Sequence, residues 1–466
     1  MSSLQKIFKM YDIRGLVGSE MTFEGVKAIG AAFVDELSLA GASLVVGHDM
    51  RDSSVEFVEA FIEGANARGA DAINLGLCST DECYFASGYL DAAAAMFTAS
   101  HNPASYNGIK LSRAGARGIS MDTGLSAILE RSQKYLDQGL EEVSEPGFSS
   151  EHEIMSEYAS YLRQLVDLSS IRPLKIVIDA ANGMGGLTAP AVLSTAANLP
   201  ALPLEIVPMY FELDGSFPNH EANPLDPKNL VDLQKAVLEH KADVGLAFDG
   251  DADRVFVIDE KGQPVTPSAI AAIVSLSEIA RAKAKGETNI SVLHNLLTSK
   301  AVAELIKSAG ATPIRTRVGH SLIKDEMAKT GAIFGGEHSA HYYFKDFYGA
   351  DSGMLAAMHV LRELGSQNKP LSEFASEFDP YFASGEINST VANAHDKLAQ
   401  IRAEYQGSPL DELDGITISS EPNSSPWWWF NVRSSNTEPL LRLNVESSDQ
   451  AACKALTDKL LGIIRS

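Results

Sequence analysis

An acidic run, Asp249-Gly-Asp-Ala-Asp-Arg254, lies between two short apolar segments, Val244–Phe248 and residues 255–258. Alternate residues of an extended segment project to the same side, so the three aspartates can converge on one point. Three close carboxylates repel one another unless a cation lies between them, and such oxygen ligands select Mg²⁺ or Ca²⁺. The spacing therefore predicts a catalytic metal site at Asp249, Asp251 and Asp253.

Two other interpretations of the acidic run compete with a catalytic metal site. A calcium-binding EF-hand also places acids at its positions one, three and five, and Glu260 would be its twelfth residue. However, Arg254 stands where that loop requires glycine, and the flanking segments resemble strands rather than helices. The other alternative is a solvated acidic turn. We favour the catalytic metal site over both.

The segment Thr98-Ala-Ser-His-Asn-Pro103 follows a run of small residues, 92–96. A serine directly after a buried run, where Asn-Pro ends regular structure, is a candidate nucleophile. The same pattern is typical of an ordinary turn or helix cap, and taken alone the turn is favoured. The chain has no G-x-S-x-G elbow and no P-loop motif, so the sequence gives no support to an esterase or a P-loop enzyme.

Two further segments have the residue types that bind sugars and phosphates. Gly335-Gly-Glu-His-Ser-Ala-His341 combines flexible backbone with a carboxylate, a hydroxyl and two imidazoles, which suits a polyol; a metal-binding or surface turn is the alternative. Arg433-Ser-Ser-Asn-Thr-Glu-Pro439, followed by Arg442, offers guanidinium, hydroxyl and backbone N–H donors that match the acceptors of a phosphate. Without further context, a phosphate site and an ordinary polar turn are equally favoured for the second segment.

Three polar segments, 139–153, 259–268 and 365–372, divide the chain into pieces of ordinary domain size. We expect four domains, at residues 1–148, 149–258, 259–368 and 369–466. In the first three, short apolar runs that resemble strands alternate with helical patterns, which indicates α/β units. The last piece has expected strands at 415–419, 428–432 and 441–445 before a C-terminal helix, which indicates a smaller α+β domain.

The composition is that of an ordinary globular chain with a strongly acidic balance. Its 466 residues carry a formal net charge of −23 and include three cysteines, too few and too badly spaced for a zinc site or a disulfide framework. No run approaches the ~20 apolar residues that span a bilayer, and the first residues lack the apolar core of a signal peptide, so we expect a cytoplasmic protein. The charge and the lack of a long basic run argue against nucleic acid or membrane partners, whereas a small phosphorylated substrate needs only a few arginines.

Five segments in this order resemble the α-D-phosphohexomutase superfamily, and in particular its phosphomannomutase/phosphoglucomutase branch. They are Tyr11-Asp-Ile-Arg-Gly, Thr98-Ala-Ser-His-Asn-Pro, Asp249-Gly-Asp-Ala-Asp-Arg, Gly336-Glu-His-Ser-Ala-His and Arg433-Ser-Ser-Asn-Thr. The resemblance covers essentially the whole chain, and the joint pattern is highly specific. It implies an α/β fold with a four-domain heart-shaped architecture, in which three related α/β domains and a smaller α+β C-terminal domain surround a central cleft.

The resemblance also implies roles for particular residues. Ser100 is the expected phosphorylated nucleophile and, with Asp249, Asp251 and Asp253, a ligand of Mg²⁺. The other expected catalytic residues are Arg14, His101, Lys110, Arg254 and His320, of which Lys110 or His320 acts as acid or base. The residues expected to bind substrate are Tyr11, the sugar loop Glu337, His338, Ser339, Ala340 and His341, and the phosphate loop Arg433, Ser434, Ser435, Asn436 and Thr437 with Arg442.

The implied activity is that of a phosphomannomutase, an intramolecular phosphotransferase of the isomerase class. Such an enzyme interconverts mannose 6-phosphate and mannose 1-phosphate through a phosphoserine and a hexose 1,6-bisphosphate, which also serves as activator. We expect it to act on glucose phosphates as well, as a monomer or dimer.

Two departures from the family pattern leave the preferred hexose open. The sugar loop has the sequence Glu-His-Ser-Ala-His, where the phosphomannomutase branch usually has Glu-Met-Ser-Gly-His and the glucosamine branch has Glu-Gln-Ser-Gly-His. In addition, residues 294–298 do not contain the lysine that helps bind substrate in the phosphomannomutase branch. The alternatives to a phosphomannomutase are a phosphoglucosamine mutase, a metal-dependent sugar phosphatase and a non-catalytic sensor of sugar phosphates.

Overall fold

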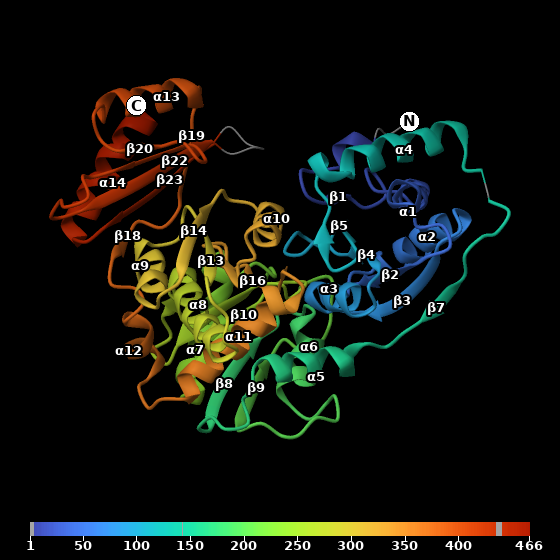
Figure 1. The fold of residues 1–466 in the computed structure, drawn as a ribbon, viewed down its shortest axis with the longest axis horizontal. Helices are drawn as coiled ribbons and strands as arrows, with labels where there is room; N and C mark the ends of the chain where they lie inside the picture. The colour runs from blue at the N-terminus through green and yellow to red at the C-terminus, as the bar shows by residue number, and fades with distance from the viewer. Residues whose placement is uncertain (1–3, 142, 435–439) are drawn as a thin grey trace.

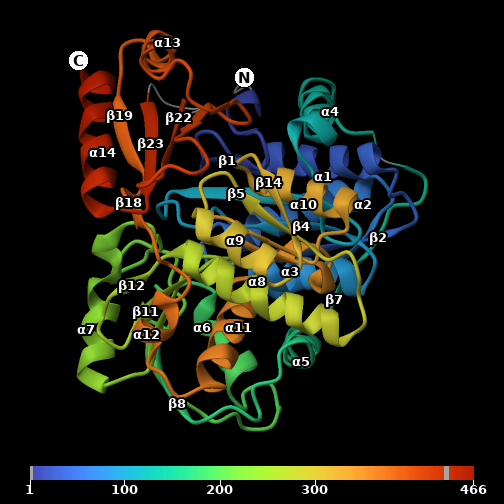
Figure 2. The same ribbon diagram turned by 60° about the vertical axis from the view of Figure 1, so that its left-hand side comes forward.

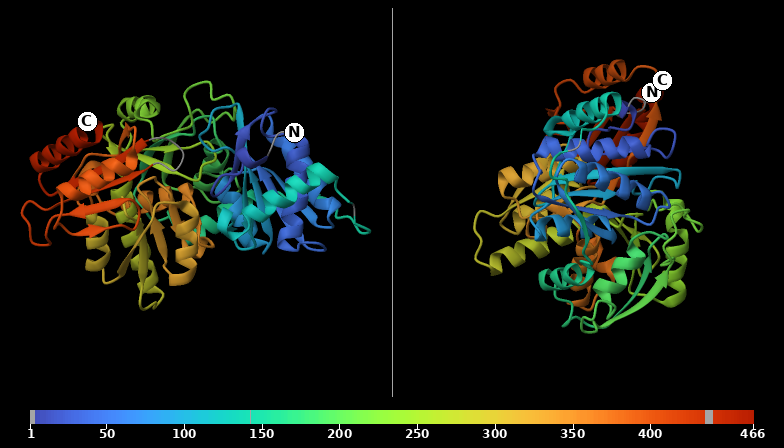
Figure 3. Two further views of the ribbon diagram at one scale, coloured as in Figure 1. Left: turned by 90° about the horizontal axis from the view of Figure 1, so that it is seen from above. Right: turned by 90° about the vertical axis from the view of Figure 1, so that its right-hand side faces the viewer.

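The computed structural model describes residues 4–141, 143–434 and 440–466, without the side chains of residues 320–322. Within these ranges the strands form four sheets, each built from one continuous stretch of the chain. Figure 1 shows the four units in an arc, with the N-terminal and C-terminal domains at its two ends. In the left view of Figure 3, the strands and helices of the two middle domains lie between these ends.

The first domain contains a mixed sheet in the order β1-β5-β4-β2-β3-β7, with β6 beside β5. Strands β2, β3, β4 and β7 are parallel neighbours, and β5 runs antiparallel to β4 and β1. The elements are η1 (Leu4–Lys6), β1 (Ile13–Leu16), α1 (Phe23–Leu37), β2 (Ser43–His48), α2 (Ser54–Ala67), β3 (Asp71–Leu77), α3 (Thr80–Tyr89), β4 (Ala93–Phe97), β5 (Tyr106–Arg113), β6 (Arg117–Gly118), η2 (Met121–Thr123), α4 (Leu125–Gln138) and β7 (Ser149–Glu151).

The second domain contains a sheet in the order β12-β11-β10-β8-β9, of which β10, β8 and β9 are parallel. Its strand β12 lies within the polar segment 259–268 and pairs with β11. The elements are α5 (Met155–Leu165), β8 (Leu174–Asp179), α6 (Gly185–Leu193), β9 (Leu204–Met209), η3 (Pro227–Leu230), α7 (Val231–His240), β10 (Val244–Phe248), β11 (Val255–Asp259) and β12 (Pro264–Val265).

The third domain contains a sheet in the order β14-β13-β15-β16-β17, of which β14, β13 and β15 are parallel. The elements are α8 (Pro267–Ala284), β13 (Ser291–Asn295), α9 (Lys300–Ser308), β14 (Thr312–Thr316), α10 (His320–Thr330), β15 (Phe334–Gly336), β16 (Tyr342–Phe344), η4 (Lys345–Phe347), β17 (Ala350–Asp351), α11 (Gly353–Gly365) and α12 (Leu371–Ser376).

The fourth domain contains an antiparallel sheet in the order β18-β23-β22-β21-β20, with β19 also beside β23. Figure 2 shows α14 on the outer face of this sheet. The elements are β18 (Phe382–Ala383), β19 (Ile387–Thr390), α13 (Ala394–Glu404), β20 (Leu410–Asp411), β21 (Ile416–Ser419), β22 (Trp428–Ser434), β23 (Leu440–Ser447) and α14 (Gln450–Arg465).

The first three sheets share one topology. Three parallel strands followed by an antiparallel fourth occur in the orders β3-β2-β4-β5, β9-β8-β10-β11 and β14-β13-β15-β16. Helices connect the parallel strands, as parallel pairing requires. The loop from the third to the fourth strand therefore lies at the same place in each domain, and it holds residues 98–105, 249–254 and 337–341. The nucleophile, metal and sugar segments predicted from the sequence are thus equivalent loops of three related domains.

The hydrophobic cores divide the molecule unequally. One large core joins α3 of the first domain to the second and third domains, through residues such as Phe85, Tyr158 and Phe344. The fourth domain has a separate core made of its own strands and helices, with Phe430, Leu443 and Leu460 fully buried. The first three domains are therefore packed as one body, whereas the fourth is internally complete. The α/β class and the smaller α+β C-terminal domain agree with the prediction; the boundaries after residues 148, 258 and 368 stay a prediction.

Candidate active site

Ser100 is the third residue after strand β4 and has a backbone conformation that few serines adopt. Its φ of 50° is in the left-handed region, and its N–H donates to Thr98 Oγ1 at 2.8 Å. The side chain is 5% exposed. Its hydroxyl donates to Asp249 Oδ2 at 2.8 Å and lies 3.2 Å from His101 Nδ1. A serine of the first domain is thus in direct contact with the acidic loop of the second.

The acidic loop is buried together with its three carboxylates. Asp249, Asp251 and Asp253 are at most 2% exposed, and one oxygen from each lies within 4.8 Å of the others. Asp251 Oδ1 is buried and has no hydrogen-bond partner among the described residues. Buried carboxylate oxygens that converge in this way are the donor set of a hard divalent cation. The residues present therefore fit a metal site.

The loop backbone also fits the serine closely. A side chain at Gly250 would place its Cβ 2.4 Å from the carbonyl oxygen of Ser100, so this position accommodates only glycine. The next residue but one, Ala252, has φ of 62°. These two features let the chain turn back between consecutive aspartates while it packs against the serine loop.

Two cations partly balance the three carboxylates. The Arg254 side chain donates to Asp249 Oδ2 from Nε at 3.0 Å and from Nη2 at 2.7 Å, and Nη2 lies 3.4 Å from Ser100 Oγ. Lys110 Nζ donates to Asp251 Oδ2 at 2.7 Å and to Asp253 Oδ2 at 2.6 Å. Lys110 and Arg254 therefore only partly offset the three carboxylates, and burial raises the pKa of Asp249 to about 7.

The environment fixes the protonation of the neighbouring bases. Burial disfavours the charged form of Lys110, but the carboxylates of Asp251 and Asp253 outweigh it and raise the pKa of this lysine well above its usual value. Burial, together with the charges of Arg254 and Arg14, lowers the pKa of His101 to about 3. His101 Nδ1 accordingly accepts from Arg254 Nη2 at 2.7 Å. At neutral pH the lysine is cationic and the histidine is neutral.

Arg14 and Tyr11 extend this cluster in two directions. The Arg14 guanidinium donates to Asn102 Oδ1 at 2.5 Å and to Asp12 Oδ2 at 2.6 Å, which holds it against the serine loop. Tyr11 is within electrostatic range of Arg317, Asp414 and Glu337, and burial raises its pKa. The segment at residues 11–14 therefore connects the serine loop to the third and fourth domains.

The sugar loop of the third domain is centred on a buried carboxylate. Glu337 is 1% exposed; its Oε1 accepts from Tyr343 Oη at 2.7 Å, and its Oε2 accepts from Asn295 Nδ2 at 3.2 Å. Burial raises the pKa of Glu337 despite these donors. Ser339 Oγ lies 3.0 Å from His341 Nδ1, and Ala340 turns the loop with φ of 65°.

One residue of this loop reaches the metal loop and another turns away. His341 lies with Asp253 and Asp351 in a second group whose ligand atoms are within 4.8 Å of one another. In contrast, the Nδ1 of His338 lies 3.2 Å from Ser268 Oγ, and His338 lines a cavity together with Asp379 and Tyr381. The structure therefore brings His341 to the acidic loop and separates His338 from it.

The predicted phosphate loop begins at the end of β22. Arg433 and Arg442 are cross-strand neighbours, and both pair with Glu386, at 3.0 Å from Arg433 Nη2 and 3.3 Å from Arg442 Nη1. Ser434 is exposed at the end of β22. Residues Ser435, Asn436 and Thr437 lie outside the described residues, as does the side chain of His320. In the described part of the chain, both arginines pair with Glu386 of their own domain, so the structure gathers them into a group separate from the serine cluster.

Comparisons with known proteins agree with this arrangement. Four sequence models of phosphoglucomutase/phosphomannomutase match the chain in order: alpha/beta/alpha domain I at residues 5–137, domain II at 156–262, domain III at 266–381 and the C-terminal domain at 386–463. The chain belongs to the phosphoglucomutase/phosphomannomutase family. The predicted family and the predicted enzyme class, a phosphohexomutase, are thereby confirmed.

Relatives of this family match along nearly their whole length. A protein of Xanthomonas campestris pv. campestris named "Phosphohexose mutases" is 38% identical over 98% of this chain and 99% of its own. A phosphomannomutase of Escherichia coli K12 is 36% identical over 98% of both chains. The crystal structure of a phosphoglucomutase/phosphomannomutase family protein from Burkholderia thailandensis has a TM-score of 0.85 at 29% identity, covering 99% of this chain and 98% of that one. None of the helices in the described ranges has the length and apolar character to cross a membrane.

The family motifs do not include one arginine that the serine loop depends on. Arg51, 3% exposed, follows strand β2 and donates to the carbonyl oxygens of Ser100 and Asn102 from Nη2 and of Pro103 and Tyr106 from Nη1, all at 2.7–2.9 Å. Its Nε pairs with Asp49 at 3.2 Å. The position of Arg51 in the sequence could have placed it near Ser100, because the residues after the parallel strands β2 and β4 meet at one edge of the sheet.

Two further contacts of the acidic loop also escaped the sequence analysis. Thr80, at the start of α3, donates from Oγ1 to Asp251 Oδ2 at 2.6 Å. Asp351, in β17, pairs with Lys324 Nζ at 2.7 Å while it neighbours Asp253. Neither residue belongs to a recognisable motif, and only the packing of three domains brings them to the site.

Proposed function

We propose that this protein interconverts mannose 6-phosphate and mannose 1-phosphate through a phosphorylated Ser100 and a hexose 1,6-bisphosphate, and that it also acts on glucose phosphates. The observation that carries this proposal is the 2.8 Å contact between Ser100 Oγ and Asp249 Oδ2 across two domains. It joins a nucleophile to a cation site, which is the arrangement that phosphoryl transfer needs. Full-length relatives named phosphomannomutase support the choice of sugar.

The proposed metal is Mg²⁺, held by Asp249, Asp251, Asp253 and an oxygen of the phosphorylated Ser100. When bound, it would supply positive charge to the transferring phosphoryl group. Arg254 supports the same group from the protein side, since its Nη2 already reaches both Asp249 Oδ2 and Ser100 Oγ. Lys110, kept cationic by two of the aspartates, adds to this charge.

The reaction consists of two phosphoryl transfers that use the same residues. In the first, the bond between phosphorus and Ser100 Oγ breaks, a bond from phosphorus to the free sugar hydroxyl forms, and that hydroxyl gives its proton to a base. Ser100 Oγ takes up a proton as it leaves. In the second, the bond between the phosphorus of the other phosphate and its sugar oxygen breaks, a bond from that phosphorus to Ser100 Oγ forms, and the proton of Oγ passes to the sugar oxygen. His101 is neutral with its Nδ1 engaged by Arg254, so we assign it to positioning. Lys110 is held in its charged form, so it is the candidate acid, and His320 is the candidate base.

Substrate recognition is assigned to the other side of the molecule. Arg433 and Arg442, with Ser434, Ser435, Asn436 and Thr437, would hold the phosphate that is not reacting, by charge-assisted hydrogen bonds. Glu337 and Ser339 would accept and donate to sugar hydroxyls that mannose and glucose share. Tyr11, Arg14, His338, Ala340 and His341 complete the proposed substrate contacts. Both ends of the bisphosphate must fit the arginine pair in turn, which requires recognition of charge rather than of sugar shape.

The setting of this activity is also part of the proposal. A chain with a net charge of −23 favours small phosphorylated hexoses over nucleic acid or membranes as partners. We place it in the cytoplasm, as a monomer or dimer, with hexose 1,6-bisphosphate as its activator.

The test is a set of coupled assays on mannose 1-phosphate, glucose 1-phosphate and glucosamine 1-phosphate, with inorganic phosphate measured in parallel. We expect both neutral hexoses to react, activation by hexose 1,6-bisphosphate and no steady release of inorganic phosphate. Turnover of glucosamine 1-phosphate alone would identify a phosphoglucosamine mutase. Continuous phosphate release without any bisphosphate requirement would identify a phosphatase, and ligand binding without phosphate on Ser100 would identify a sensor.

A further inference from the structure

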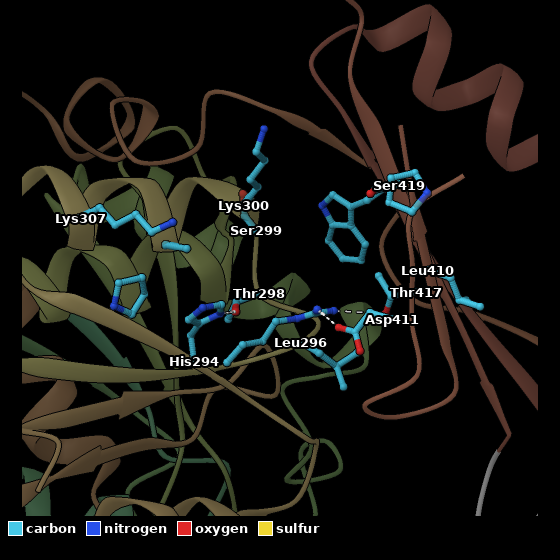
Figure 4. Close-up of a pocket in the computed structure, with 15 residues that line it drawn as sticks. His294, Leu296, Thr298, Ser299, Lys300, Lys307, Leu410, Asp411, Thr417 and Ser419 are labelled. Atoms are coloured by element: carbon cyan, nitrogen blue, oxygen red, sulfur yellow. Dashed lines mark hydrogen bonds and ion pairs between the residues drawn. The ribbon is translucent and has the colours of Figure 1, made fainter. Parts of the chain in front are cut away.

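A cavity of about 460 Å³ lies between the third and fourth domains, away from the serine cluster. Its walls come from the end of β13, from α9 and β14 on one side and from β20, β21 and β22 on the other. Figure 4 shows His294, Thr298 and Lys307 facing Asp411, Thr417 and Ser419 across it. The volume is within the range of small-molecule sites, so it admits an organic ligand.

The third-domain side of the cavity is cationic although the chain is strongly acidic. Lys300, Lys307 and Arg315 line it, opposed by a single lining acid, Asp411, which pairs with Arg315. Lys300 Nζ lies 3.4 Å from Glu304 and 4.2 Å from the ring centre of Trp427. The side-chain Nζ of Lys307 has no hydrogen bond or ion pair with any described residue. Lys307 is therefore directly available to an anion, whereas Lys300 would exchange Glu304 for it.

A buried histidine adds a hydrogen-bond acceptor. His294 is 8% exposed, and its Nδ1 lies 2.9 Å from Thr298 Oγ1. The Thr298 hydroxyl gives its one proton to the carbonyl oxygen of Asn295, so Nδ1 must be the donor to Thr298. Burial lowers the pKa of His294 to about 4, in agreement with a neutral ring. Its Nε2 is therefore an unprotonated acceptor with no partner among the described residues.

The remaining walls are apolar and flat. Leu296, Pro313, Pro409 and Leu410 line the cavity together with the indole of Trp429. The Trp429 Nε1 donates to Glu446 Oε2 at 2.6 Å, which fixes the plane of the ring. A fixed aromatic face beside prolines can stack on a flat ring.

We propose that this cavity binds a nucleoside monophosphate, with the base against Trp429, an amino group of the base donating to His294 Nε2, and the phosphate at Lys300 and Lys307. A base with an amino group offers a flat ring and a hydrogen-bond donor within one rigid unit, which meets both the aromatic face and the free acceptor on His294. Successive side chains of a strand point to opposite faces, so residues 429, 431 and 433 of β22 share one face of the sheet. Trp429 and Arg433 are about 13 Å apart along that strand. The described lining of the cavity includes neither Arg433 nor Arg442, so the nucleotide site lies beside the arginine pair that we assign to the hexose phosphate.

The ligand would bridge two domains that have separate cores. The fourth domain carries the arginine pair on its own core, so a ligand that ties it to the third domain changes the position of that pair. This consequence for the KM of the sugar phosphate rests on the proposed function. Binding itself does not, because it can be measured on an inactive enzyme.

The experiment measures binding to the full-length Ser100→Ala protein by calorimetry, with the fluorescence of Trp427, Trp428 and Trp429 as a second readout. The probes are the four common nucleoside monophosphates, with adenosine and ribose 5-phosphate as the two halves of one of them. We expect saturable binding of at least one nucleotide and at least roughly tenfold weaker binding of each half. Lys307→Gln, on an exposed position of α9, should weaken the nucleotide roughly fivefold. Lys454→Gln, exposed on α14, is the matched control and should leave it unchanged.

Three results would overturn the site. The first is the absence of binding by any of the four nucleotides at millimolar concentration. The second is binding that is equal for ribose 5-phosphate and the whole nucleotide, since the aromatic face would then contribute nothing. The third is binding that survives Lys307→Gln and Trp429→Phe but is lost in Arg433→Ala, which would place the nucleotide in the sugar-phosphate site.

Discussion

Ser100 and Asp249 belong to different domains, yet their side chains are 2.8 Å apart and both are at most 5% exposed. Arg433 and Arg442 belong to one sheet, and both pair with a carboxylate of their own domain, Glu386. The contact between Ser100 and Asp249, the first junction, is buried beside the core shared by three domains. The group of Arg433, Arg442 and Glu386, the second junction, belongs to a domain with a separate core, whose sheet faces the third domain across a cavity.

This difference indicates that catalysis and substrate binding are carried out by separate parts of the molecule. The atoms that break and form bonds must be held in a fixed geometry, since small displacements are costly in rate. The groups that hold a molecule while it turns round must instead let it go at each cycle. A rigid chemical junction beside a separately packed recognition domain meets both requirements. Substitutions at the first junction should therefore act on kcat, and substitutions at the second on KM.

The largest effect is expected from Ser100→Ala. Removing the proposed nucleophile should lower mutase activity by roughly four orders of magnitude or more. Peptide mass spectrometry of freshly purified wild type should find phosphate on Ser100. Ser105→Ala, an exposed serine of the same loop, is the control and should keep both activity and phosphate. Full activity in Ser100→Ala would end the phosphoserine mechanism.

The next largest effect concerns the metal. Chelation should abolish turnover and Mg²⁺ should restore it, because the two cations only partly offset the three buried carboxylates. Asp251→Asn should cost on the order of a hundredfold in kcat and weaken Mg²⁺ binding measured by calorimetry. Asp458→Asn, exposed on α14, controls for the loss of one acidic charge. Unchanged activity after exhaustive chelation would make the acidic loop structural.

Arg433→Ala should weaken substrate binding by the fourth domain. The loss of a charge-assisted contact with phosphate costs about 1.5–3 kcal/mol, which raises the KM of the sugar phosphate roughly tenfold to a hundredfold. The bisphosphate should also escape before its second transfer, so that activity comes to depend on added hexose 1,6-bisphosphate. Arg402→Ala, an exposed arginine of the same domain, should change neither quantity. A normal KM and no greater release of bisphosphate would remove Arg433 from phosphate binding.

Arg51→Lys tests the geometry of the serine loop with a smaller change. Lysine cannot donate to four carbonyl oxygens at once, so the serine loop should lose part of its fixed geometry. We expect kcat to fall roughly tenfold with KM little changed. Arg113→Lys, which affects a single bond to the Thr123 carbonyl, is the matched control. A rise in KM with normal kcat would contradict the division between the two junctions.

The sequence by itself determined the local elements and the chemical motifs. The apolar runs at residues 43–47, 174–179 and 415–419 are strands, and the helical spacing at 231–238 is helix α7, because burial of one face dictates these patterns. The joint order of five motifs was enough to identify the family, since each motif has a fixed chemical requirement. The convergence of Asp249, Asp251 and Asp253 was predicted from their alternate spacing on an extended segment, and they do converge, but through a turn with φ of 62° at Ala252.

Only the tertiary structure decided which motifs meet. The equivalence of the loops at 98–105, 249–254 and 337–341 is a property of sheet topology and leaves no repeat in the residues. Arg51, Thr80 and Asp351 have roles that depend on strands and helices far apart in the chain, so no local pattern marks them. The sequence also placed His338 and His341 in one loop, and the backbone turn at Ala340 sends them to different sides. Spacing fixes which side chains a segment offers, whereas the packing of the domains fixes what each one reaches.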